Sequence, residues 1–368
     1  MGLGAWALLL VRIALVVIVL GEVYVTATVQ LPGLMHPTAS GTDASNYDAA
    51  GQRLNDGHNL YGPLLPGDRP VPRYPGAFPA PLLSPPLVAV MWRPLAVFGD
   101  PSMTIWWAID LALVVGVCVA LAARGQRWTL GGLLVLLALG WPLARVLSEP
   151  YHYLGDESPI SIAALSGNLN GYLTALLLVV WWATSTGRPR LAGIAVGLAA
   201  VLKLGPFVLG WWLVVRRDWP AVKAFVATVV VLGIVGLLGA GLAANLAFAR
   251  LTLGAGITPT PLSIPGILNT WLGMDLHRAG GGTIVATILG LAVIYATGRN
   301  ARISFLVAIL VVIYSSPVVL TGNFVLLLAA LGPGAGPGRV GAAAGSASTS
   351  VTAYAAATRL PAPRLTRP

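Results

Sequence analysis

Charge is scarce in this sequence, and so is cysteine. Asp, Glu, Lys and Arg together make up 9% of 368 positions, whereas hydrophobic residues make up 57%. A soluble globular domain is about one quarter charged, so this composition excludes a soluble protein. The single cysteine, Cys118, excludes a disulfide framework within the chain and a cysteine metal cluster.

Long apolar runs occupy most of the chain instead. Crossing a bilayer takes about 20 apolar residues, and in hydrocarbon the backbone must satisfy its own hydrogen bonds, which favours helices. The sequence therefore predicts an all-α, polytopic transmembrane helical bundle of about 9–11 membrane segments. The predicted segments are 5–29, 82–98, 103–122, 129–147, 161–183, 190–215, 222–243, 281–297, 302–318 and 319–331.

The net charge of +10 comes from basic residues at the ends of these runs and near the C-terminus. This pattern is typical of the positive-inside rule and of attraction to anionic membrane lipids, and it does not favour nucleic-acid binding. We expect a multi-pass protein of the plasma membrane, with residues 1–331 forming one membrane domain. Its loops at 31–81 and 245–280 are predicted to be external, and 332–368 is predicted to be a disordered basic tail.

One run, 190–215, has basic residues at both ends and the sequence Lys203-Leu-Gly205-Pro206 near its middle. Proline interrupts a helix, so we expect a re-entrant hairpin whose two ends lie on the same side of the membrane. Lysine inside a membrane is costly and usually functional. Lys203 is predicted either to hold a lipid phosphate or to bond the carbonyl groups that the break sets free.

Other residues within the apolar runs have structural interpretations. Gly193 and Gly197 form a small-x-x-x-small face that is typical of close helix packing. Arg93 and Asp110 lie on adjacent segments and are predicted to pair with each other.

The first long loop carries the strongest candidate for a catalytic group. Asp43 and Tyr47 are four residues apart and share one face if the segment is helical. A carboxylate in this place suits a general base for a substrate hydroxyl. The alternative is that Asp43 only caps the start of a short helix.

Several motifs, in order along the chain, resemble those of glycosyltransferase family 87. Asp43, Tyr47 and Ala50 match a D-x-x-x-Y-x-x-A element, and Gly57, Leu60 and Tyr61 match G-x-x-L-Y. Two further matches lie in the membrane segments: Gly167, Asn168 and Asn170 fit G-N/Q-x-N, and residues 192–206 fit A-G-x-x-x-G-L-A-x-x-x-K-x-x-P. Two departures are Ser84, where the family carries tyrosine before its Pro-Pro pair, and the absence of a late histidine pair after Ser316-Pro317.

This resemblance implies the GT-C fold and a glycosyltransferase that takes a sugar, mannose above all, from a polyprenyl-phosphate donor. Asp43 would then be the general base of an inverting, metal-free transfer on the non-cytoplasmic side, with a glycolipid or lipoglycan of an actinobacterial cell envelope as acceptor. The candidate substrate-binding residues are Tyr47, Tyr61, Arg73, Asn168, Asn170, Lys203, His277, Arg278 and Asn323. The alternatives are an arabinofuranosyltransferase of the same fold, a lipid-glycan transporter and a non-catalytic membrane scaffold.

Overall fold

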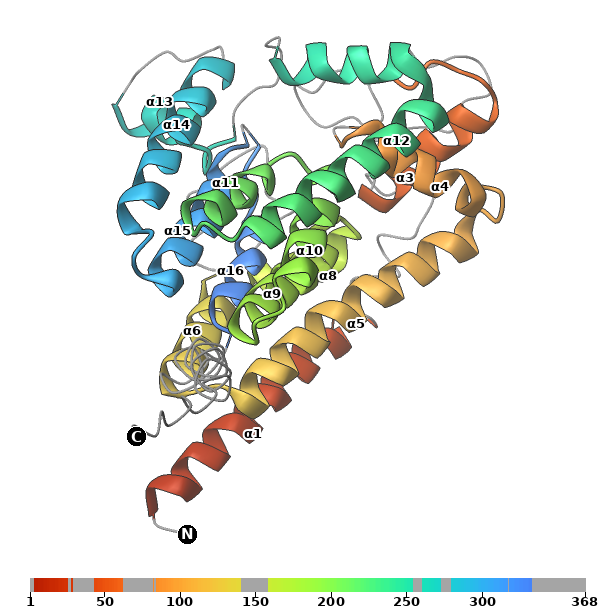
Figure 1. Ribbon diagram of the computed structural model, residues 1–368. Coiled ribbons are helices and arrows are strands. Elements are labelled where there is room, and N and C mark those ends of the chain that lie inside the picture. Colours follow the sequence, from red (N-terminus) through yellow and green to blue (C-terminus); the bar gives the residue numbers. More distant parts are fainter. Residues whose placement is uncertain are drawn as a thin grey trace, which may run out of the picture.

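The computed structural model describes residues 3–25, 28, 43–61, 82, 84–139, 158–253, 260–272, 279–316 and 318–332. Within these ranges all regular structure is helical, which confirms the predicted all-α fold (Figure 1). Arg73, His277 and Arg278, and the predicted tail beyond residue 332, lie outside the described residues. The helices are α1 (Leu3–Val25), α3 (Asp43–Asn55), α4 (Pro86–Ala96), α5 (Asp100–Arg124), α6 (Arg127–Ala138), α8 (Pro159–Ser166), α9 (Asn170–Ser185), α10 (Pro189–Leu202), α11 (Phe207–Val215), α12 (Trp219–Leu253), α13 (Ile264–Leu272), α14 (Ala279–Thr297), α15 (Ala301–Tyr314), the 3-10 helix η3 (Thr321–Leu326) and α16 (Leu327–Ala330).

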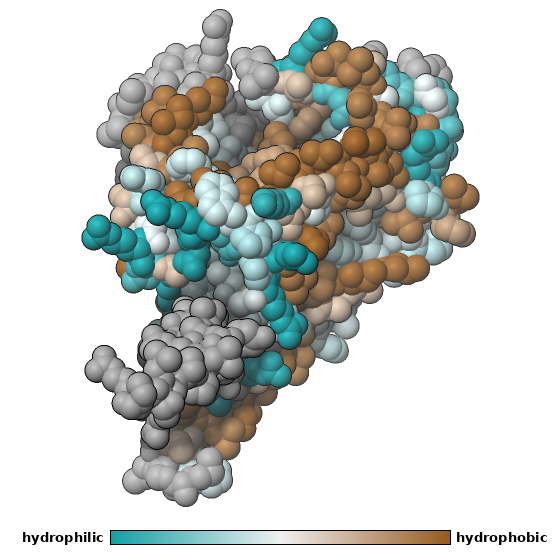
Figure 2. All heavy atoms as spheres, in the orientation of Figure 1, coloured by the Kyte–Doolittle hydropathy of each residue, from teal (hydrophilic) through white to brown (hydrophobic). Residues whose placement is uncertain are grey.

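Three of these helices are long and apolar enough to cross a membrane. Their apolar stretches are Ala5–Glu22, Pro101–Arg124 and Trp219–Thr252. The shorter apolar helices include α6, α10, α14 and α15. Hydrophobic side chains cover much of the visible surface of α12 and α5 (Figure 2), as a lipid-facing surface requires.

The predicted break in the 190–215 segment is confirmed. α10 ends at Leu202, Lys203 takes an extended conformation (φ −150°, ψ 134°), and α11 begins at Phe207. The chain passes close to α15 here, because a Cβ added at Gly205 would lie 2.7 Å from the carbonyl oxygen of Val312. Only a residue without a side chain fits this approach.

The two ends of the broken segment lie on the same side of the bundle. A Cβ at Gly193, near the start of α10, would lie 2.0 Å from the carbonyl oxygen of Ala221, near the start of α12. Further along both helices, a Cβ at Gly197 would lie 2.6 Å from Cβ of Thr228. The two helices therefore run in the same direction, and α11 returns to the level where α10 began. Both the hairpin and the packing role of the two glycines agree with the sequence.

Arginine and tryptophan side chains gather at this end of the bundle. The Arg302 guanidinium, at the start of α15, lies 3.6 Å from the ring centroid of Trp128 and 5.6 Å from that of Trp181. Arg188, just before α10, lies 4.7 Å from the ring centroid of Trp182. Cation–π contacts of this kind stabilise cations beside aromatic rings. We call this the arginine end; the start of α9 and the break after α10 lie at the opposite end.

The close approach of α10 to α12 generates a prediction. Gly193→Ala should lower the stability of the fold by about 1–3 kcal/mol, because its methyl group has no room beside Ala221. The matched control is Gly233→Ala in α12, which meets nothing within 4 Å and should be neutral or gain about 0.5–1 kcal/mol. Thermal unfolding of the detergent-solubilised protein measures both, and equal melting temperatures would contradict the packing.

Candidate functional site

Helix α3 carries two of the predicted site residues, Asp43 and Tyr47. α3 begins at Asp43, and its Gly51 packs so closely on α4 that a Cβ there would lie 2.9 Å from the backbone of Trp92. Tyr47 is buried between two indole rings, with ring centroids 6.3 Å from Trp92 and 6.2 Å from Trp106. These contacts fix the rotation of α3, and Asp43 shares its face with Tyr47 as predicted.

Tyr47 and Tyr61 both lie beside Ser84. The Tyr61 hydroxyl donates to the carbonyl oxygen of Ser84 at 2.8 Å. Burial raises the pKa of Tyr47 well above its usual range, and the nearby charge of Asp43 raises it further. Burial also raises the pKa of Tyr61. Both phenols are therefore neutral hydrogen-bonding groups at physiological pH and not proton acceptors.

Three further polar side chains are joined by hydrogen bonds into a chain near this group. Lys203 Nζ donates to Asn170 Oδ1 at 3.2 Å, and Asn170 Nδ2 donates to Asn323 Oδ1 at 3.2 Å. Asn323 Nδ2 lies 3.5 Å from the carbonyl oxygen of Val318. These residues come from the α10–α11 break, the first residue of α9 and η3, so that three distant segments of the sequence meet here.

The carboxylate of Asp43 reaches this chain electrostatically. Its negative charge acts on Lys203 and on Asp110. A carboxylate and an amine side chain thus lie near each other at this end of the bundle. An ammonium opposite a carboxylate suits a reaction in which a proton leaves one group while negative charge develops on another.

Asp110 is a buried carboxylate that sequence reasoning assigned to the wrong partner. Arg93 donates to Asn55 Oδ1 at 3.1 Å and lies 3.3 Å from the carbonyl oxygen of Gly239, so the predicted Arg93–Asp110 pair is wrong. Asp110 instead lies against the first turn of α9, without the geometry of a full hydrogen bond. A Cβ at Gly171 would lie 2.1 Å from its Oδ1.

A tight turn before α9 connects the group around Tyr47 with the polar side chains around Asn170. Gly167 ends α8 in the left-handed conformation (φ 55°), and its carbonyl oxygen accepts a 2.9 Å hydrogen bond from Trp106 Nε1. Asn168 Oδ1 accepts a hydrogen bond from the Asn170 backbone N–H at 2.7 Å. Asn168 therefore shapes the turn that presents Asn170.

The structure brings together most of the predicted site residues that it describes. The group comprises Asp43, Tyr47, Asn168, Asn170, Lys203 and Asn323, with Tyr61 beside Tyr47 at Ser84. The sequence analysis did not identify Trp106, which links Tyr47 to the Gly167 turn. The signal that could have identified it is its position four residues before Asp110, a charged residue within an apolar helix. Among the described side chains, no group of three or more His, Cys, Asp or Glu residues could hold a metal ion.

Comparisons with known proteins give a family and two relatives. The model of glycosyltransferase family 87 matches residues 83–321. This range contains Asn168, Asn170 and Lys203, begins after Asp43 and ends before Asn323.

Both curated relatives are named polyprenol-phosphate-mannose-dependent alpha-(1-2)-phosphatidylinositol pentamannoside mannosyltransferase. The one from Mycolicibacterium smegmatis is 28% identical over 155 residues, which cover 41% of this chain and 33% of the relative. The one from Mycobacterium tuberculosis is 28% identical over 308 residues, which cover 79% of this chain and 65% of the relative. The chain thus spans less than two thirds of either relative, and no solved structure matches it.

The close packing of the Gly167 turn leads to a testable prediction. Gly167→Ala should destabilise the fold twice over, by about 1–2 kcal/mol for its left-handed backbone and by about 1–3 kcal/mol for overpacking. The new methyl group would lie 2.1 Å from Trp107 Nε1 and 3.0 Å from Ala44 Cβ. Gly187→Ala is the matched control, since Gly187 has a similar φ of 69° but nothing within 4 Å. Thermal unfolding should show the larger loss at Gly167, and equal losses would mean that the turn does not press on Trp107 and Ala44.

Proposed function

Because the chain belongs to glycosyltransferase family 87, we propose that this glycosyltransferase moves mannose from a polyprenyl-phosphate donor to a glycolipid or lipid-anchored glycan. The names of both curated relatives specify a polyprenol-phosphate-mannose donor and a phosphatidylinositol-based acceptor, which supports the two substrate classes. The convergence of Asp43 and Lys203 at one end of the bundle supports the chemistry most directly.

Asp43 is the general base of the proposed reaction. Its carboxylate takes the proton from an acceptor hydroxyl, and the hydroxyl oxygen attacks the anomeric carbon of the donor sugar. The bond between that carbon and the phosphate oxygen breaks, and its electron pair leaves with the phosphate. Attack opposite to the leaving group inverts the anomeric carbon.

Lys203 stabilises the leaving phosphate in this scheme. The phosphodiester of the donor carries one negative charge and the released polyprenyl phosphate carries up to two, so a fixed ammonium binds the product-like transition state more strongly than the substrate. A phosphate is a stable leaving group, so no strong general acid is needed. Tyr47 and Tyr61 border the side of the site on which Asp43 lies. Arg73, His277 and Arg278 are proposed as further phosphate or sugar contacts.

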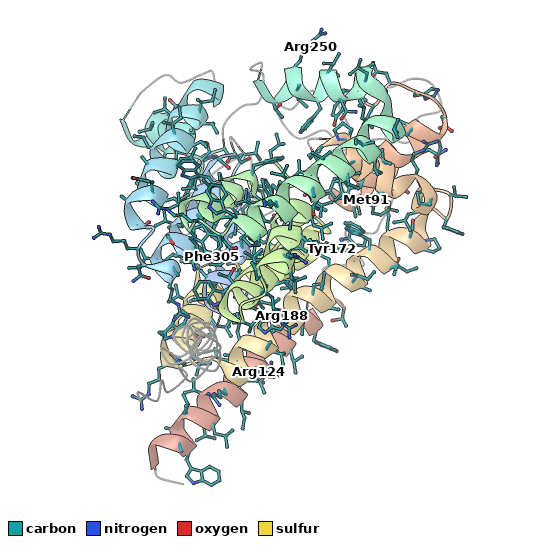
Figure 3. The ribbon with its side chains drawn as sticks, in the orientation of Figure 1. Met91, Arg124, Tyr172, Arg188, Arg250 and Phe305 are labelled. Carbon is teal, nitrogen blue, oxygen red and sulfur yellow. The ribbon has the colours of Figure 1, made fainter. Side chains whose placement is uncertain are left out.

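The distribution of charge supports a placement in the plasma membrane. Arg124 and Arg188 lie toward one end of the molecule and Arg250 toward the other (Figure 3). The positive-inside rule puts the arginine end in the cytoplasm, and the site with the 31–81 and 245–280 loops on the non-cytoplasmic side. There a polyprenyl-phosphate donor would reach it from the bilayer.

The test is sugar transfer by the purified protein in lipid nanodiscs, with labelled polyprenyl-phosphate-mannose and a phosphatidylinositol mannoside acceptor. Asp43→Asn should lower kcat by about 10²–10⁴-fold, because the amide cannot accept the proton. The matched control is Asp56→Asn, at an exposed aspartate whose carboxylate bonds Gln52, and it should transfer at the wild-type rate.

Each other outcome is informative. Full activity of Asp43→Asn would place the base elsewhere. Transfer by the wild type from a polyprenyl-phosphate-arabinofuranose donor, and not from the mannose donor, would change the sugar while keeping the enzyme class. Absence of transfer from either donor would contradict the proposed function.

A further inference from the structure

Two asparagines lie between Lys203 and the segment that follows α15. We propose that Asn170 and Asn323 are positioning residues that hold the Lys203 ammonium in place for the donor phosphate, and that they do not themselves contact the sugar. This inference rests on the proposed function of Lys203. It assigns to the late segment of the chain, which lies beyond the family match, a defined role in the site.

The hydrogen bonds that link Lys203, Asn170 and Asn323 can run in only one direction. An ammonium has hydrogen-bond donors and no acceptor, so Asn170 must turn its amide oxygen toward Lys203. Its NH₂ group then points to Asn323, which must present its own oxygen in turn. The NH₂ group of Asn323 is left facing the carbonyl oxygen of Val318, an acceptor. Lysine at one end and a carbonyl at the other therefore fix both amides.

Burial makes this arrangement rigid. Asn170 is fully buried at the start of α9, and Asn323 is 6% exposed within η3. A Cβ at Gly322 would lie 3.1 Å from Ile162 in α8, so that η3 is packed directly onto the helix that leads to Asn170. Neither amide can turn to bulk water without leaving its neighbour unsatisfied, which is costly inside a protein.

Lys203 needs such an anchor more than most lysines. It lies in an extended backbone between two helices, and its flexible stem has many rotamers. One Nζ proton bonds Asn170, and in the proposed reaction a phosphate oxygen would accept another. Fixing the ammonium before the substrate arrives reduces the entropy lost on binding. The expected consequence of losing the anchor is weaker binding of the phosphate, while the acceptor site is unchanged.

The test compares Lys203→Met, Asn323→Ala and the double variant in nanodiscs. The first readout is the Kd for sugar-free polyprenyl phosphate, and the second is the KM of each substrate. Asn323→Ala should weaken the binding of polyprenyl phosphate about tenfold and leave the acceptor KM unchanged. Without Asn323, Asn170 no longer holds the ammonium firmly, and tenfold is about the size of one hydrogen bond to a charged group. In the Lys203→Met background the same substitution should weaken binding less than about twofold, because residues that act through one another are not additive.

Asn300→Ala is the control for a purely structural loss. Asn300 caps α15 at the arginine end, where its side chain accepts hydrogen bonds from the Arg302 and Ile303 backbone N–H groups. Its removal should lower the melting temperature without changing the Kd for polyprenyl phosphate. Asn170→Asp provides a second measurement. The new carboxylate still accepts a hydrogen bond from Lys203, but its negative charge compensates that of the ammonium. This variant should therefore also weaken phosphate binding.

Additive effects of Asn323→Ala and Lys203→Met would overturn the inference, because Asn323 would then act independently of Lys203. Polyprenyl phosphate binding unchanged in Lys203→Met would overturn it as well. A wild type that binds polyprenyl phosphate but transfers no sugar would instead contradict the proposed function, so the two failures are distinguishable.

Discussion

A helix that ends inside a membrane bundle leaves backbone groups without hydrogen-bond partners. Here the same break also places a lysine in an apolar environment. Hydrocarbon offers no hydrogen bonds to a broken helix, and a buried cation is costly unless it is paired. The break after α10 is stabilised by its neighbours: Lys203 donates to Asn170, Asp43 supplies an opposite charge, and Gly205 lets the chain pass against α15. The requirement to satisfy this break is what draws α3, α9 and η3 together into one site.

Small residues decide where those elements can lie. Helices in a bilayer gain little from the hydrophobic effect when they associate, so close van der Waals packing matters more. Gly193 sets the distance between α10 and α12, and Gly51 lets α3 approach the backbone of Trp92. The first contact fixes the hairpin that carries Lys203, and the second fixes the helix that carries Asp43. The position of Asp43 relative to Lys203 therefore depends on these two glycines.

Local signals in the sequence predicted the parts of the fold that depend on neighbours along the chain. Gly205-Pro206 indicated the break, and the spacing of Asp43 and Tyr47 indicated their shared helical face; the structure has both. The rotation of one helix against another leaves no such signal. Arg93 points toward α3 and α12, whereas Asp110 points toward α9. The two side chains therefore do not pair, although their segments are adjacent in the sequence.

Contacts between residues that are far apart in the sequence could not be predicted from a single sequence either. The side-chain bond between Asn170 and Asn323 joins residues 153 positions apart. Both asparagines could be listed as polar candidates, since each lies in or beside an apolar segment. Nothing in their spacing shows that their side chains form a hydrogen bond, or that Lys203 bonds to Asn170.

The charges at the site are matched to the proposed reaction throughout its course. Before transfer the negative charge near Lys203 resides on Asp43 and on the donor phosphodiester. As Asp43 takes up the proton it becomes neutral, and a negative charge appears on the leaving phosphate instead. The ammonium therefore faces two negative charges at the start and two at the end, and is never left uncompensated in a medium of low dielectric constant. Because the total charge of the site stays constant while its location shifts, Lys203 need not move; it needs only to be held, which the buried amides of Asn170 and Asn323 can do.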